Sequence, residues 1–184
     1  MSKRVANSIE HLISLIKTDY KAWNTTTFPW FRGEPNKPKT ALKPKLYRKD
    51  HNENRLLQQF RMKDPTLGIE NIPPRGHTDQ WLFLAQHVGL PTRLLDWTKG
   101  LFIALYFALL EKVPIIWMLN PSELNRKSDP SVKDNVFALT WVDFTRTPAI
   151  SYELTDKTIS ILRSENLDRY EQEMENLQMP IWET

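Results

Sequence analysis

The stretch LAQHVGLPTRLLDWT, residues 84–98, constrains the fold of this chain more than any other segment. Gly89 suits the left-handed end of a helix, and Pro91 prevents that helix from resuming. We therefore predict a helix that begins at an N-cap, Thr78, and ends at Gly89. A short strand from Thr92 to Trp97 follows. Thr98 then caps a helix over KGLFIALYFALLEK, which is apolar on nearly all sides and so belongs at the centre of the core.

The other predicted elements mix helices and strands without regular alternation. We expect a helix over residues 8–23, capped by Asn7 or Ser8, because apolar residues recur there at helical spacing. TTTFPWFRGE predicts a strand that ends near Arg32, and PNKPKTALKPKLYRKD predicts an extended surface loop. The remaining predictions are a helix over residues 53–62, buried strands at VPIIWMLN and NVFALTWVDF, and an acidic surface helix at SENLDRYEQEMENLQ, with Leu167, Tyr170, Met174 and Leu177 facing inward. This order indicates an α+β fold: a single mixed domain, residues 1–184, with a small sheet flanked by helices.

Composition narrows the class of protein. The 184 residues are 40% apolar, which is enough for one domain with a real core. Cysteine is absent, which excludes disulfides, a thiolate nucleophile and a cysteine-ligated zinc site. The start of the chain has the pattern of an amphipathic helix and not of a secretion signal, and the apolar run 101–110 is half as long as a membrane span. We expect a soluble cytoplasmic protein with no membrane partner.

Charge is distributed unevenly along the chain. Residues 1–63 hold 14 Lys and Arg against 5 Asp and Glu, a net charge of +9, whereas the remainder has a net charge of −6. A basic first third is suited to a nucleotide, nucleic acid or an acidic protein. The alternative is a solvated, lysine-rich loop with no specific partner.

Arg32 is the first candidate site residue. A guanidinium near the end of an aromatic strand, followed by a glycine that permits close approach, is suited to gripping phosphate or carboxylate. The alternative is a structural ion pair with a buried carboxylate, for which Asp96 is the obvious partner. His87, near a helix end, is either a proton carrier or phosphate donor, or a packing residue favoured by the helix dipole. Strand alternation would place Arg93 and Asp96 on opposite faces, so that one points into a cleft with Arg32.

Several motifs are missing from the sequence. It contains no GxxxxGK[ST], GxGxxG, GxSxG or HExxH, and its four histidines lack metal-ligand spacing. No metal site is expected. The candidate catalytic residues are Arg32, His87, Arg93 and Asp96, and the candidate ligand-binding residues are Gly33, Gln86, Thr92, Lys43 and Lys45.

The motifs FPWFRGE, LKPKLYR, LLQQF, LAQHVGLPTRLLDWT and ALYFA together resemble the FRG-domain family, named for its Phe-Arg-Gly motif. The likeness extends over residues 28–125, and leaves an acidic helix and a terminal strand in residues 150–184. The family pattern usually continues into a segment resembling RxxxQxGxF, and this chain ends about where that segment begins. The resemblance therefore implies a natural short form or a truncation, without the contribution of that last motif.

A more distant resemblance suggests a chemistry. An early Arg-Gly strand end, a threonine-containing strand before an alanine-rich helix, and a late acidic residue are similar to the order of motifs in ADP-ribosyltransferases. This resemblance implies that Arg32 holds the phosphates or ribose of NAD and that the 92–98 strand lines the nicotinamide pocket. The late acidic residue is not assigned; Glu183 is closest in order.

Two functions remain open, beside a purely structural role for the polar residues. The first is a nucleotide- or NAD-binding domain, acting as an ADP-ribosyl or glycosyl transferase-like effector in phage–host conflict. The second is a non-catalytic module that binds nucleic acid or an acidic protein through the basic first third of the chain.

Overall fold

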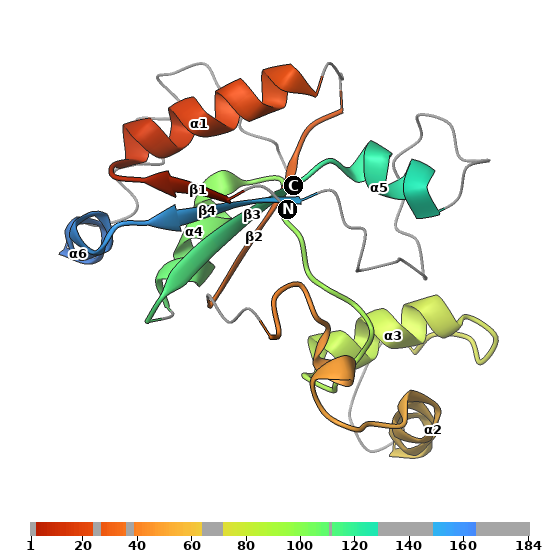
Figure 1. Cartoon of the computed structure of the whole chain (residues 1–184). Helices are drawn as coiled ribbons and strands as arrows, with labels where there is room; N and C mark the ends of the chain where they lie inside the picture. Colours follow the sequence, from red (N-terminus) through yellow and green to blue (C-terminus); the bar gives the residue numbers. More distant parts are fainter. Residues whose placement is uncertain are drawn as a thin grey trace. The chain divides into compact units, whose positions relative to one another are not determined.

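The computed structural model describes residues 3–23, 27–35, 39–63, 72–110, 112–128 and 149–164, and these have an α+β fold (Figure 1). The elements in chain order are β1 (Lys3–Ala6), α1 (Ile9–Ala22), β2 (Trp30–Pro35), the 3₁₀ helix η1 (Lys45–Arg48), α2 (Glu53–Lys63), α3 (Thr78–His87), α4 (Leu101–Leu109), β3 (Pro114–Leu119), α5 (Pro121–Ser128), β4 (Ala149–Leu154) and α6 (Asp156–Ser164). The predicted fold class is confirmed.

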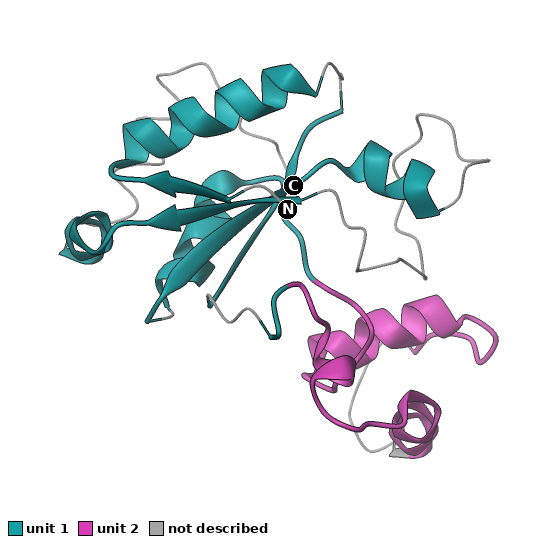
Figure 2. Cartoon of the chain, in the orientation of Figure 1, with its two compact units in different colours: residues 1–41, 96–184 teal, residues 42–95 magenta. Residues whose placement is uncertain are grey.

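The chain divides into two compact units (Figure 2). Unit 1 comprises residues 1–41 and 96–184, and unit 2 comprises residues 42–95. Unit 2 is continuous in sequence, whereas unit 1 takes segments from both sides of it. The single domain over residues 1–184 stays a prediction.

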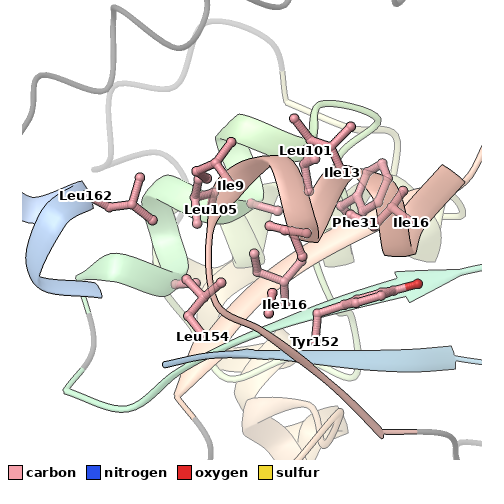
Figure 3. Close-up of a cluster of buried hydrophobic side chains, with 14 of the residues drawn as sticks. Ile9, Ile13, Ile16, Phe31, Leu101, Leu105, Ile116, Tyr152, Leu154 and Leu162 are labelled. Carbon is pink, nitrogen blue, oxygen red and sulfur yellow. The ribbon is translucent and has the colours of Figure 1, made fainter. Parts of the chain in front are cut away.

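Unit 1 contains a mixed four-stranded sheet with the order β1-β4-β3-β2. β1 runs parallel to β4, and the other two pairings are antiparallel. Alternate strand residues, including Phe31, Ile116, Met118, Tyr152 and Leu154, join apolar side chains of α1, α4 and α6 in one buried cluster (Figure 3). Because successive strand residues point to opposite faces, these three helices pack on one face of the sheet.

The helix α1 confirms the predicted helix over residues 8–23. Ser8 is its N-cap, and the Ser8 hydroxyl accepts a hydrogen bond of 3.1 Å from the His11 backbone N–H. The strand β1 before it was not predicted. A polar cluster around the buried Asp19 fixes this strand: Asp19 on α1 accepts hydrogen bonds of 2.8 Å from Arg4 on β1 and from the Tyr152 hydroxyl on β4. Burial, together with Asp19, raises the pKa of Tyr152.

The helix α4 departs from prediction in two respects. Its N-cap is Gly100, so the predicted cap at Thr98 is wrong; the Thr98 hydroxyl, two residues before this cap, accepts a hydrogen bond from the Gly100 N–H. The helix is also not enclosed on all sides. One apolar face packs in the core, but a second apolar face is about half exposed: Ile103, Tyr106, Phe107 and Leu110. Apolar residues on every side of a helix therefore did not imply burial on every side.

Unit 2 is helical and has its own small core. One cluster of buried apolar residues comes from α2 and α3: Leu57, Phe60, Trp81, Leu82 and Ala85. Phe60 and Trp81 pack edge to face with ring centroids 5.9 Å apart. Gly89 has a φ of +88°, which confirms its predicted place after the end of α3. The helix begins at Thr78 itself, with His77 as the N-cap, so the predicted cap at Thr78 is displaced by one residue.

The predicted strand from Thr92 to Trp97 is wrong. Residues 92–97 form no ladder, and one bridge at Thr98 pairs with Phe31. Side chains instead of a neighbouring strand bind the backbone here: the Arg93 N–H donates to Glu53 and the Leu94 N–H donates to the Thr92 hydroxyl. The elements α5, β4 and α6 were not predicted. NVFALTWVDF, and SENLDRYEQEMENLQ beyond Ser164, lie outside the described residues.

Candidate functional site

The three residues of the Phe-Arg-Gly motif have three different environments on β2. Phe31 is buried in the cluster under the helices. Gly33 lies directly against α4, since a Cβ atom at this position would be 1.8 Å from the Ala104 carbonyl oxygen and 2.5 Å from the Ala108 nitrogen. The absence of a side chain at Gly33 therefore lets the backbone of α4 contact the sheet. Its role in ligand binding stays a prediction.

Arg32 points to the other face of the sheet, where it joins a buried carboxylate. Its Nε donates to Glu34 at 3.3 Å and its Nη1 donates to the backbone carbonyl of Asp96 at 2.6 Å. The second Glu34 oxygen accepts a 2.9 Å hydrogen bond from the Trp117 indole. The acidic partner of Arg32 is thus Glu34, and the predicted ion pair with Asp96 is replaced by a bond to its carbonyl. The Arg32 side chain keeps 17% of its surface exposed.

In unit 2, Arg93 is held by Glu53 at the start of α2. The carboxylate of Glu53 accepts from the Arg93 backbone N–H at 3.1 Å, from Nε at 2.6 Å and from Nη2. Hydrogen bonding to Glu53 raises the pKa of Arg93 against the opposing effect of burial, and the charge of Glu53 adds to the rise. Glu53 is almost fully buried and Arg93 is partly exposed. This pair ties residues 84–98, which we call the signature stretch, to α2.

The candidate ligand residues Gln86 and Thr92 contact each other. The Thr92 hydroxyl donates to the side-chain oxygen of Gln86 near the end of α3. The Thr92 carbonyl accepts a 3.2 Å hydrogen bond from the Leu46 N–H in η1. Thr92 is 1% exposed, so these polar groups bind one another inside unit 2. Thr92 therefore connects α3 to the segment that contains Lys43 and Lys45.

The chain around η1 alternates buried and exposed residues. Leu42, Pro44 and Leu46 are buried, whereas five polar side chains of residues 43–49 are exposed: Lys43, Lys45, Tyr47, Arg48 and Lys49. We call these five residues the basic segment. Arg48 Nε donates to the Lys43 carbonyl at 2.7 Å, and the Tyr47 N–H donates to the Pro44 carbonyl at 3.0 Å. The segment is thus anchored on its apolar side and closed by its own hydrogen bonds.

The predicted site residues fall into two groups. Arg32, Gly33 and Asp96 belong to unit 1, and the structure joins Arg32 to Asp96. His87, Arg93, Gln86, Thr92, Lys43 and Lys45 belong to unit 2. His87 is the last residue of α3 and is exposed. The cleft shared by Arg32, His87 and Arg93 or Asp96 stays a prediction.

Two other features of the described residues bear on ligand binding. A surface hollow of about 530 Å³ lies along α6 and contains none of the predicted site residues; it is lined by Lys112, Asp156, Ile159, Ser160, Arg163 and Ser164. Within the described ranges, no group of three or more histidine, aspartate or glutamate side chains is placed to hold a metal ion.

None of the helices described is both long and apolar enough to cross a bilayer.

The sequence did not identify the acidic partners, Glu34 and Glu53. Glu34 could have been found, since residues two apart on a strand share a face and Glu34 follows Arg32 by two. Glu53 precedes Arg93 by forty residues, and no local pattern joins them. Tyr47 was also missed, although the alternation in LKPKLYR places apolar and cationic residues on opposite sides of the chain.

The sheet of unit 1 and the helical unit 2 define an α+β protein in which the signature residues hold elements together. Comparison with protein families gives a match to the FRG domain over residues 28–114. An FRG-domain match therefore covers residues 28–114, as the sequence motifs indicated. Searches of curated proteins and of solved structures returned no match.

Proposed function

We propose that this protein binds nucleic acid, and that the basic segment contacts the phosphate backbone. The observation that carries the proposal is the exposure of four cationic side chains on a segment whose intervening apolar residues are buried: Lys43, Lys45, Arg48 and Lys49. Neutralising phosphates with lysine and arginine releases counterions, and this is the main source of sequence-independent affinity for nucleic acid.

The spacing of the two lysines supports this ligand. Pro44 between them has a φ of −52° and a ψ of 152°, which is an extended conformation. Two extended residues span about 7 Å, so Lys43 and Lys45 can meet successive phosphates of one strand. Among the described residues, no ion pair joins Lys43, Lys45 or Lys49 to a carboxylate. Their positive charges therefore attract an anionic ligand that approaches from solution.

Rigidity is the second support for the proposal. A flexible lysine loop loses conformational entropy when it binds, whereas an ordered loop has already lost it. Here Leu42 and Leu46 are buried, and the bond from Leu46 to Thr92 fixes the segment to the signature stretch. In this proposal the signature stretch, residues 84–98, holds the basic segment in place.

Neutralising two lysines of the basic segment tests the proposal. We expect the double variant Lys43→Gln/Lys45→Gln to bind a fluorescein-labelled 20-nucleotide DNA about tenfold more weakly, because two phosphate contacts are lost. Fluorescence anisotropy at 50 mM salt gives the dissociation constants. Equal affinity of this variant and the wild type would refute the proposal.

The matched control is Lys17→Gln/Lys21→Gln, which removes the same charge from two exposed lysines of α1. This control is expected to retain the wild-type affinity within twofold, since general charge is worth less than charge on the binding surface. A competition with poly-glutamate separates an acidic protein partner from nucleic acid. An acidic protein partner would be favoured if poly-glutamate displaced the DNA at equal charge concentration.

A second candidate function is NAD binding in unit 1, with Arg32 as the phosphate ligand. The observation that favours it is the orientation of Arg32 by Glu34 and by the Asp96 carbonyl, which leaves Nη2 and one hydrogen of Nη1 for another acceptor. A fixed guanidinium is suited to phosphate. In this form the protein would be an ADP-ribosyl or glycosyl transferase-like effector in phage–host conflict, with NAD as substrate.

Conservative replacement of Arg32 tests this second function. Calorimetry should detect NAD binding by the wild type, and Arg32→Lys should lower the affinity at least tenfold, because lysine keeps the charge but loses the planar donors. Arg126→Lys, an exposed position on α5, is the control. If the wild type neither binds NAD nor releases nicotinamide from it, this candidate is eliminated.

A further inference from the structure

We propose that the basic segment prefers single-stranded nucleic acid, because a base stacks on the ring of Tyr47. This inference rests on the proposed binding of nucleic acid. It adds that the ligand is single-stranded and that Tyr47 is the residue that contacts its bases. Tyr47 is the aromatic member of the basic segment and is 45% exposed.

In the sequence, Tyr47 stands between cationic residues. Lys45 precedes it by two residues, and Arg48 and Lys49 follow it directly. Lys45 and Arg48 are three residues apart in η1 and so lie on one side of this 3₁₀ helix, with Tyr47 on an adjacent side, within reach of a strand bound to the two cations. Alternation of cations with an aromatic ring is the pattern by which proteins bind single strands without reading their sequence.

The Tyr47 backbone is fixed, which makes the ring a defined platform. The Tyr47 N–H donates to the Pro44 carbonyl, and the preceding residue, Leu46, is 5% exposed and bonded to Thr92. A side chain with few rotatable bonds on a fixed backbone loses little entropy when a base stacks on it.

The preference for single strands follows from the accessibility of the faces of the bases. In a duplex both faces of each internal base are covered by its neighbours, and a protein ring must first unstack them. In a single strand the faces are accessible, and every base offers one. Tyr47 therefore favours single strands, whereas the four cations serve either form.

The test uses the full-length protein and three probes: a 12-nucleotide single-stranded DNA, the same length of abasic sugar-phosphate chain, and a 12-base-pair duplex. The variants are Tyr47→Leu, which removes the ring but keeps an apolar side chain, and Tyr47→Phe, which keeps the ring. We expect the wild type and Tyr47→Phe to bind the single strand about tenfold more tightly than the abasic chain, a typical effect of stacking one base. Tyr47→Leu should bind both chains equally.

The outcomes separate the two proposals. If the wild type binds the abasic chain as tightly as the base-bearing strand, stacking on Tyr47 is wrong, although phosphate binding stands. Preference for the duplex, or an unchanged preference in Tyr47→Leu, also overturns the inference. If the wild type binds none of the three probes at 50 mM salt, the proposed function itself fails. Circular dichroism of each variant establishes that unit 2 has kept its helices.

Discussion

Replacing Gly33 by alanine is expected to destabilise unit 1 by about 3 kcal/mol or more, the upper end of what overpacking costs. The new methyl group would lie 1.8 Å from the Ala104 carbonyl oxygen and 2.5 Å from the Ala108 nitrogen. Both are backbone atoms of α4, which cannot rotate away as a flexible side chain can. Relief requires α4 to move off β2, which opens the buried cluster between them.

The control for this prediction is Gly76→Ala. Apart from the neighbours of Gly76 in the chain, no atom of the described residues lies within 4 Å of a Cβ atom built there, so the change should alter stability by no more than about 0.5 kcal/mol. Urea unfolding followed by far-ultraviolet circular dichroism measures both variants at the same m-value. A Gly33→Ala protein as stable as Gly76→Ala would contradict the close packing of α4 on β2.

Replacing Arg93 by alanine is the second change with a large expected effect. It leaves the carboxylate of Glu53, of which 7% is exposed, without its guanidinium partner. Losing one member of a fully buried pair typically costs about 3–5 kcal/mol. Because Arg93 keeps 37% of its side chain exposed, water can reach the vacated space, and we expect about 2–3 kcal/mol.

Arg55→Ala is the matched control, since Arg55 lies on the same helix as Glu53 and is exposed. Its loss should change the free energy of unfolding by less than about 0.5 kcal/mol. Thermal unfolding and urea unfolding of both variants provide the comparison. Equal stability of the two variants would show that the Arg93–Glu53 pair is not a structural tie, and would return Arg93 to the candidate catalytic residues.

Elements with a strong local signal could be predicted from the sequence. The helix α1 has an N-cap serine and one apolar face, and the end of α3 has a glycine that adopts a positive φ. The strands β1 and β4 could not be predicted, since they pair with each other across nearly the whole described chain. Such pairing depends on tertiary contacts such as the Asp19 cluster, which a local window does not contain.

The false strand at residues 92–97 has a specific cause. The threonine and leucines of TRLLDW suit a strand, but a strand also needs a neighbour that binds its backbone. Glu53 and the Thr92 hydroxyl occupy the N–H groups of Arg93 and Leu94 instead. The side chain of Glu53, forty residues before Arg93, thus determines the local structure. Because residues 92–97 form no strand, the prediction that Arg93 and Asp96 lie on opposite faces of one no longer applies.

The candidate site shows the same division between local and distant signals. The importance of Arg32 and Arg93 was visible because isolated guanidinium groups in apolar sequence require partners. Their partners were not visible, and these decide the chemistry: Glu34 holds Arg32 on the sheet and Glu53 holds Arg93 in unit 2. Lys43 and Lys45, by contrast, were predicted as ligand residues from charge, and the structure shows them exposed.

The central claim is that the FRG signature supports an exposed basic segment that contacts phosphates. The most direct test is the salt dependence of single-stranded DNA binding by the wild type and by Lys43→Gln/Lys45→Gln. Each phosphate contact on a single strand contributes about −0.7 to the slope of log K against log salt, so the slope for the variant should be shallower by about 1.4. Two parallel lines would contradict the account, because they would mean that neither lysine meets a phosphate.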